Sequence, residues 1–121
     1  MKKVLIVMVL IITMFSVVHA ASFEDVSGLN CESAVESLKS IGIINGVDEN
    51  EFAPKKSVTR AELSKMVVSA LNIKGATTKT FSDIQGHWGE AFIKQAAEIG
   101  ILKGYSDGTF KPDKEVSYAE A

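Results

Sequence analysis

Several residue types are scarce in this 121-residue chain, and each scarcity excludes a class of protein. Cys31 is the only cysteine, so an internal disulfide framework is excluded. With His19 and His87 as the only histidines and no cysteine pair, a zinc site lacks ligands. The sequence also has no nucleophile elbow, phosphate loop or histidine–cysteine pairing. We therefore expect a protein that is not an enzyme and that holds no metal or cofactor.

Clustered basic residues are also missing. The chain has 13 Lys and Arg against 15 Asp and Glu, which gives a net charge of −2. Without Lys2 and Lys3 the balance becomes 11 against 15, a net charge near −4. An acidic balance argues against nucleic acid as a partner, because such binders need clustered basic residues.

The one long apolar run stands at the N-terminus. Two lysines precede the uncharged, mostly apolar residues 4–18, and the tripeptide at 18–20 has the small residues that a signal peptidase recognises. Fifteen helical residues cover about 22 Å, less than the roughly 30 Å hydrocarbon core of a membrane. We therefore expect residues 1–20 to be a cleaved signal peptide rather than a membrane anchor. The mature chain would begin at Ala21, be secreted and make no membrane contact.

The rest of the chain repeats itself. At an offset of 58, residues 23–63 align with residues 81–121 without a gap, and 14 of the 41 positions are identical. Chance would give about two or three matches. A short polar linker, residues 75–80, joins the copies. The predicted division is a signal peptide at 1–20, a first repeat at 21–75 and a second, incomplete repeat at 76–121.

Each copy is predicted to begin with a helix. In the first copy Asn30 is the expected N-cap and Gly42 the expected C-terminal stop. In the second copy the helix is expected from about Trp88 to Gly100. The expected apolar stripes are Ala34, Leu38 and Ile41 in the first copy and Phe92, Ala96 and Ile99 in the second.

A loop and a second helix follow in each copy. The loops contain turn residues, among them Asp48 and Asp107, and lack the ligand spacing of a calcium-binding EF-hand. The second helix starts at Thr59 with a capping box to Glu62 and is expected to end at Lys74-Gly75. In the second copy this helix starts at residue 117, and the sequence ends after four more residues. We expect its exposed stripe in the first copy to lack partners: Leu63, Met66, Val67 and Leu71.

The two copies resemble the S-layer homology family. The second carries Phe81-Ser-Asp83-Ile84, His87-Trp88, and the long match from Gly100 through Gly104-Tyr105 to Phe110-Lys-Pro112. The first carries Phe23-Glu-Asp25-Val26, Gly42-Ile43-Ile44-Asn45-Gly46, Phe52-Ala-Pro54 and Thr59-Arg60-Ala61-Glu62. Together these motifs cover essentially the whole chain after residue 20.

The resemblance implies both a fold and a function. The fold is all-α: helix-loop-helix repeats, normally three, form a pseudo-threefold spindle around a central three-helix bundle. The function is the non-covalent attachment of an exported surface protein to the cell wall. The implied partner is a secondary cell-wall polysaccharide or a peptidoglycan-linked polymer, typically pyruvylated, which binds in grooves between neighbouring motifs. The location is the cell wall or surface layer.

The resemblance also implies the ligand-binding residues. The family's basic residue corresponds to Arg60, its aromatic residue to Trp88, its early aspartates to Asp25 and Asp83, and its Gly-Tyr element to Gly104 and Tyr105. Three positions depart from the family's pattern. Asn30 stands where the motif has tryptophan, Val47 where it has tyrosine, and Tyr118 where it has arginine. A groove that contains Tyr118 would lose its anion-binding side chain.

Arg60 and Trp88 each have two interpretations. Arg60, the only arginine, stands in the first turn of a helix, where free amide groups and the helix dipole favour anions. It could grip a pyruvate carboxylate in the groove between the copies, or form a surface ion pair with Glu62. Trp88, the only tryptophan, could stack on a sugar ring across that groove or plug the core.

Two other functions remain open beside cell-wall anchoring. The repeats could be a structural module that assembles a surface layer by association with further repeats or with other copies of the chain. They could instead be the anchoring part of a longer extracellular enzyme. Asp25 and Asp83 do not suggest a glycosidase pair, because they occupy equivalent positions and are expected to cap or tie a helix in each copy.

Overall fold

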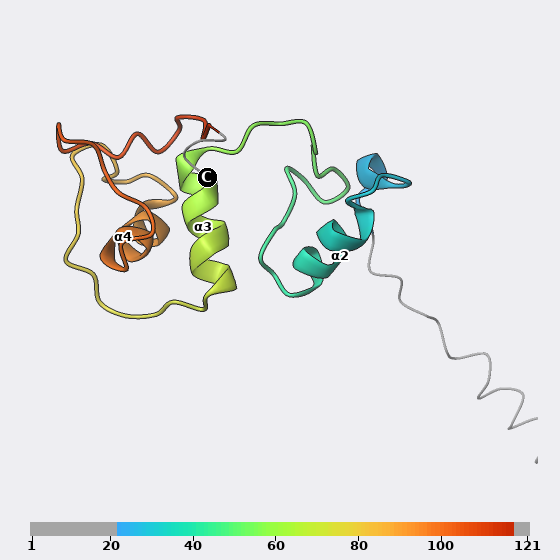
Figure 1. The fold of residues 1–121 in the computed structure, drawn as a ribbon, viewed down its shortest axis with the longest axis horizontal. Coiled ribbons are helices and arrows are strands. Elements are labelled where there is room, and N and C mark those ends of the chain that lie inside the picture. The colour runs from blue at the N-terminus through green and yellow to red at the C-terminus, as the bar shows by residue number, and fades with distance from the viewer. Residues whose placement is uncertain (1–21, 118–121) are drawn as a thin grey trace, which may run out of the picture.

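The computed structural model of the chain describes residues 22–117. The expected signal peptide and Tyr118 lie outside the described residues. Four helical elements follow in order: a 3-10 turn η1 (Glu24–Val26), then α2 (Glu32–Ser40), α3 (Arg60–Ala70) and α4 (Glu90–Glu98) (Figure 1). Between residues 22 and 117 the only extended pairing is an isolated bridge between Thr59 and Glu115. The predicted all-α class is confirmed.

The helices pack around two separate cores (Figure 1). One lies between α3 and α4, and its buried side chains are Ala61, Val68, Ile84, Ile93, Ala96, Leu102 and Phe110. The other lies beside α2, and its buried side chains are Phe23, Val26, Val35 and Ile44. Helix α3 belongs to the first repeat by sequence, yet it packs on α4 of the second repeat. The boundary between the repeats in sequence is therefore not the boundary between the cores.

Helix α3 has partners on two sides, which corrects the prediction of an unpaired stripe. Leu63 packs against the core shared with α4, and Met66 packs against the core beside α2. Leu71 alone of that stripe is largely exposed, at 57%. The helix also ends earlier than expected, at Ala70, because Asn72 takes a left-handed φ of 49° and turns the chain before Lys74.

Helix α2 turns a different face inward from the one predicted. Val35 is buried, whereas Ala34, Leu38 and Ile41 are exposed. Apolar residues occur on two sides of this helix, and the side that packs is the one reached by Phe23, Val26 and Ile44. The helix starts after Cys31 rather than Asn30, but it ends as predicted, with Gly42 at a φ of 75°.

The predicted stripe of α4 is correct only in part. Ala96 is buried and Phe92 packs against the core, but Ile93 and Ala97 are the other buried positions. Ile99 is 45% exposed, since it follows the last residue of the helix. Among residues 22–117 no helix is both long and apolar enough to cross a membrane.

Backbone pairing fixes the start of α3 against the second repeat. The capping box is present as predicted: Glu62 N–H donates to Thr59 Oγ1 at 3.2 Å, and Thr59 N–H donates to Glu62 Oε2 at 2.8 Å. Two further amides donate across the repeats, from Arg60 to the carbonyl of Lys114 at 3.0 Å and from Ala61 to that of Pro112 at 2.9 Å. The first turn of α3 is therefore a junction between the copies.

Candidate ligand-binding site

A groove of about 310 Å³ lies on the first repeat and reaches Trp88 of the second. Its other lining residues come from the loop after α2 and from the first half of α3. The lining residues are Ile43–Val47, Phe52–Pro54, Lys56–Val58, Glu62, Lys65, Met66 and Trp88. The groove expected from the sequence contained both Arg60 and Trp88, and Trp88 lines this groove whereas Arg60 does not.

Two lysines and a carboxylate supply the charge of this groove. Lys56 Nζ donates to Glu62 Oε1 at 3.1 Å. In one orientation of the Asn45 amide, both its nitrogen and its oxygen form hydrogen bonds. The nitrogen donates to Ile44 O at 3.0 Å, and the oxygen accepts from Lys65 Nζ at 3.0 Å. The groove thus combines positive charge, amide groups and apolar surface, which suits a saccharide with an acidic substituent.

The ionisation of Glu62 is favoured by its surroundings. Partial burial raises the pKa of this carboxyl, but the hydrogen bond from Thr59 N–H and the nearby Lys56 ammonium outweigh that effect and hold the pKa below its ordinary value. Glu62 therefore balances the charge of Lys56. The other lysine of the groove, Lys65, has no carboxylate oxygen within 4.0 Å among the described residues.

Trp88 presents an open indole to the groove. Its side chain is 56% exposed and belongs to neither buried core, so it does not plug the interior. The His87 ring lies beside it, with ring centroids 5.4 Å apart. An exposed indole on a groove wall can stack on the apolar face of a sugar ring.

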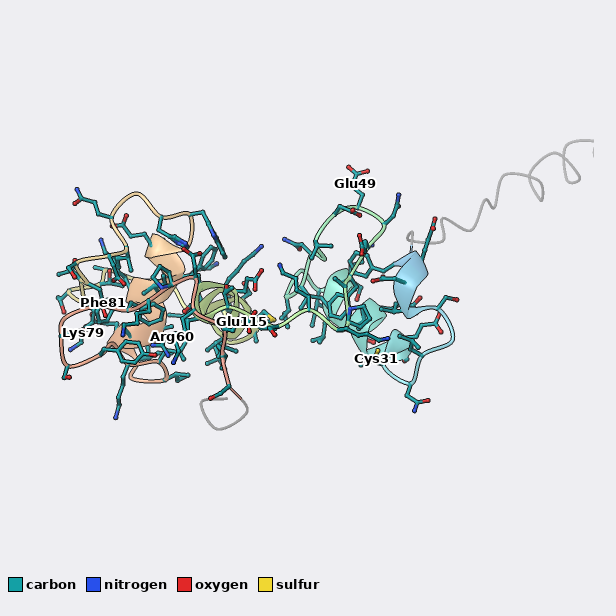
Figure 2. The ribbon with its side chains drawn as sticks, turned by 90° about the horizontal axis from the view of Figure 1, so that it is seen from above. Cys31, Glu49, Arg60, Lys79, Phe81 and Glu115 are labelled. Carbon is teal, nitrogen blue, oxygen red and sulfur yellow. The ribbon has the colours of Figure 1, made fainter. Side chains whose placement is uncertain are left out.

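Arg60 lies elsewhere, in the lobe of the second repeat, as Figure 2 shows. The side chain is only 5% exposed. Its Nε donates to Phe110 O at 2.8 Å, its Nη2 donates to Lys103 O at 2.6 Å, and its guanidinium lies 4.4 Å from the Phe110 ring centroid. It forms no ion pair with Glu62, which pairs with Lys56. The surface ion-pair interpretation is wrong.

The helix-terminus argument for an anion at Arg60 is also wrong. The amides of Arg60 and Ala61 donate to Lys114 O and Pro112 O, and the Glu62 amide donates to Thr59 Oγ1. These pairings leave no free amide in the first turn of α3 to receive a ligand. The sequence could not reveal this, because the accepting carbonyls lie in the other repeat.

Gly104 and Tyr105 are close to Arg60. The Arg60 guanidinium lies 5.1 Å from the Tyr105 ring centroid, and Lys114 Nζ donates to Tyr105 Oη at 3.0 Å. A side chain at Gly104 would run into the Phe81 ring and come within 2.9 Å of Thr109 O, so glycine is required there for packing. The structure thus brings Arg60, Gly104 and Tyr105 together, and Arg60 does not line the groove that contains Trp88.

Asp25 and Asp83 hold the loops of the two repeats in the same way. Asp25 accepts from the amides of Phe52 and Ala53 at 2.9 and 2.7 Å. Asp83 accepts from the amides of Phe110 and Lys111 at 2.8 and 2.7 Å. Each carboxylate therefore uses both of its oxygens to tie a loop to the segment before the first helix.

The pKa of Asp83 reflects these bonds. Burial raises the pKa, but the hydrogen bonds from the Phe110 and Lys111 amides outweigh it and hold the pKa below its ordinary value. The ionised carboxylate is therefore the form that the fold stabilises.

Sequence reasoning missed the polar residues of the groove. Lys56 carried a signal, because it is one of the identical pairs of the repeat, matched by Lys114. Asn45 and Lys65 carried none, since only the packing of the repeats brings them to the same groove as Trp88. Val47, which replaces a tyrosine of the motif, lines the groove and is 46% exposed, and Asn30 is exposed on the surface.

Comparison with known proteins supports the resemblance of both copies. The S-layer homology domain matches residues 22–64 and 80–121. An S-layer protein of Bacillus licheniformis is 33% identical over 104 residues, which cover 83% of this chain and 12% of that protein. A cellulosome-anchoring protein of Acetivibrio thermocellus is 32% identical over 94 residues, which cover 73% of this chain and 21% of that protein.

A third relative is named as an uncharacterized cell wall amidase of Bacillus anthracis. It is 32% identical over 104 residues, which cover 83% of this chain and 19% of the amidase. The chain thus spans about a fifth or less of the length of these relatives. The domain match and the surface-layer names agree with the expected location at the cell surface. Both matched segments carry the repeat and the helical fold, and the chain belongs to the S-layer homology domain family.

Proposed function

We propose that these repeats attach an exported protein non-covalently to the cell wall by binding a wall polysaccharide that carries an acidic group, such as a pyruvylated sugar. The observation that supports this best is the exposed indole of Trp88 on the groove that also contains Lys56 and Lys65. The indole offers a face for the sugar, and Lys65 offers a charge for the acid group. The similar cellulosome-anchoring protein is named for an anchoring role.

In this proposal the repeats bind and do not catalyse. The groove contains one carboxylate, Glu62, which is paired with Lys56 and with the Thr59 amide. Glycoside hydrolysis normally uses two carboxyl groups across the scissile bond. Where such repeats occur beside an enzyme, as the amidase name suggests for that relative, their part would be attachment.

Binding to purified wall polysaccharide tests the proposal. Loss of the Trp88 indole should remove the stacking contact, so Trp88→Ala should weaken binding about fivefold to tenfold, and Trp88→Phe should weaken it less. Lys65→Ala should bind the native polymer about threefold more weakly than the parent chain does. On a polymer without its pyruvyl groups, the parent chain and Lys65→Ala should bind equally well. The measurement is titration calorimetry with the native and the depyruvylated polymer.

Lys74→Ala is the matched control, because Lys74 is an exposed lysine just beyond α3 that does not line the groove. It changes the net charge as Lys65→Ala does. Equal affinity of the parent chain and Trp88→Ala would disprove the role of the groove. A parent chain that associates with itself and does not bind the polymer would favour the surface-assembly alternative, for which the exposed Leu38 of α2 and Ile41 just after it offer apolar area.

A further inference from the structure

His87 links three parts of the second repeat. Its side chain is 15% exposed, and its Nδ1 accepts from the Gly89 amide at 3.0 Å. Its Nε2 lies 3.1 Å from Asp113 Oδ1, and its ring faces that of Trp88. One imidazole thus connects the start of α4, the turn after Phe110 and the indole on the groove.

The first repeat shows that the local turn does not need this imidazole. Leu29 and Asn30 occupy the equivalent positions of His87 and Trp88. The amides of Leu29 and His87 donate to Val26 O and Ile84 O, each at 3.0 Å. The next turn is also shared, since Gly28 and Gly86 donate to the carboxylates of Glu32 and Glu90 at 2.8 and 3.0 Å. The histidine and the tryptophan are therefore an addition to a turn that forms without them.

The contacts of His87 identify its tautomer. An Nδ1 that accepts a hydrogen bond carries no proton, so the proton is on Nε2, which donates to Asp113. The imidazole thus uses both of its nitrogens to join the start of α4 to the turn after Phe110.

The surroundings of His87 combine a few charged groups with tight packing. Asp113, its hydrogen-bond partner, has a side chain that is 81% exposed. Glu90 and Lys94 of α4 line a surface hollow together with His87 and Trp88, and they pair with each other. Helix α3 presents the uncharged Ala61, which would lie 3.1 Å from a Cβ at the buried Gly89. The side of the turn that faces α3 is therefore closely packed.

We propose that His87 is the positioning residue of Trp88: its imidazole bridges the Gly89 amide and Asp113 and holds the neighbouring indole at the groove. The part of this inference that concerns the ligand rests on the proposed function. The part that concerns the position of the indole does not, because Trp88 is the only tryptophan and its fluorescence can be measured without ligand. Polymer affinity would then depend on a residue that acts through the position of the indole.

Two substitutions separate positioning from folding. His87→Asn keeps an acceptor where Nδ1 was, since Asn Oδ1 can accept from the Gly89 amide. His87→Leu places in the second repeat the residue that the first repeat already has at Leu29, so the turn can still form. The measurement is acrylamide quenching of Trp88 fluorescence in the full chain.

The quenching constant of His87→Leu should be about twofold higher than that of the parent chain, with unchanged helical circular dichroism. The constant of His87→Asn should stay close to the parent value, because the acceptor for the Gly89 amide is kept. A quenching constant in His87→Leu equal to that of the parent would overturn the inference. Polymer affinity measured on the same samples should fall as quenching rises. If the polymer binds none of the samples, the proposed function fails, while the quenching result still decides the role of His87.

Discussion

Arg60 is a charged side chain held in the interior by two backbone carbonyls. At 5% exposure its guanidinium has lost most of its water and gained Phe110 O, Lys103 O and the faces of two aromatic rings. Those carbonyls belong to the loop of the second repeat, whereas Arg60 begins the second helix of the first. Arg60 therefore links the two repeats through buried hydrogen bonds, and its guanidinium interacts mainly with groups inside the fold.

Replacement of Arg60 should consequently destabilise the protein. Arg60→Ala leaves two carbonyls without their donor and opens space beside Phe110, so the free energy of unfolding should fall by about 2–4 kcal/mol. Arg60→Lys should recover only part of this, because an ammonium cannot reach both carbonyls as a planar fork does. Urea unfolding followed by circular dichroism measures the difference, with Lys74→Ala as the control.

The capping box between Thr59 and Glu62 does not use the side chain of Arg60, so the cap alone would preserve folding when Arg60 is replaced. The cap is present, but it is not the only bond at this junction. An unfolding midpoint for Arg60→Ala equal to that of the parent would show that the interior bonds add nothing, and would reopen a role for Arg60 in ligand binding.

At the scale of single elements, the loop of each repeat depends on an aspartate upstream of the first helix. The pKa of Asp83 is lowered in the folded chain, as described above, so folding favours its ionised form. A lowered folded pKa means that the added stability is present above the unfolded pKa, which is about 4, and is lost as the pH falls through the folded pKa.

The loop should therefore loosen in acid, and Asp83→Asn should flatten part of that response. The parent chain should lose stability as the pH falls below about 4, and the variant, less stable at neutral pH, should lose less. Thermal unfolding at a series of pH values is the measurement, with Glu36→Gln on the exposed face of α2 as the control. A variant whose stability falls as steeply as that of the parent would show that other carboxylates cause the acid response.

Sequence predicted the elements better than their faces. The capping box of α3 and the glycine stop of α2 are local patterns, and both were predicted correctly. The buried face of α2 was not, because Leu38 and Val35 both fit a helical stripe and only the position of Phe23 decides between them. The same holds for the site: Arg60 pairs with carbonyls 43 and 50 residues away, and no local pattern shows such partners.

At the scale of the whole molecule, the two cores are unequal. The core between α3 and α4 joins helices from both repeats, whereas α2 makes no comparable contact with another described helix. Equivalent positions of the two repeats differ in burial in the same sense. Ala96 of α4 is fully buried, whereas Leu38, its equivalent in α2, is 37% exposed. We expect α2 and its loop to open more readily than the pair of α3 and α4.

Four glycines of the repeat can test this difference in stability. Gly46 and Gly104 are equivalent, and an added methyl group at either would overlap the first phenylalanine of its own repeat, Phe23 or Phe81. Gly42 and Gly100 are equivalent too, with φ values of 75° and 76°, but an added methyl group at either would meet nothing within 4 Å. The second pair therefore controls for backbone strain alone, which costs about 1 kcal/mol for alanine at positive φ.

Gly46→Ala should unfold the smaller core and leave the amides of α3 and α4 protected from hydrogen exchange, because that pair of helices does not depend on Phe23. Gly104→Ala should remove protection from both α3 and α4, since Phe81 and Phe110 belong to their core. Gly42→Ala and Gly100→Ala should lower stability by similar, smaller amounts and change the protection pattern little. Hydrogen exchange by mass spectrometry resolves these regions. If Gly46→Ala also removed the protection of α3 and α4, the two cores would unfold as one unit, and Met66, which joins α3 to the first core, would be the contact that couples them.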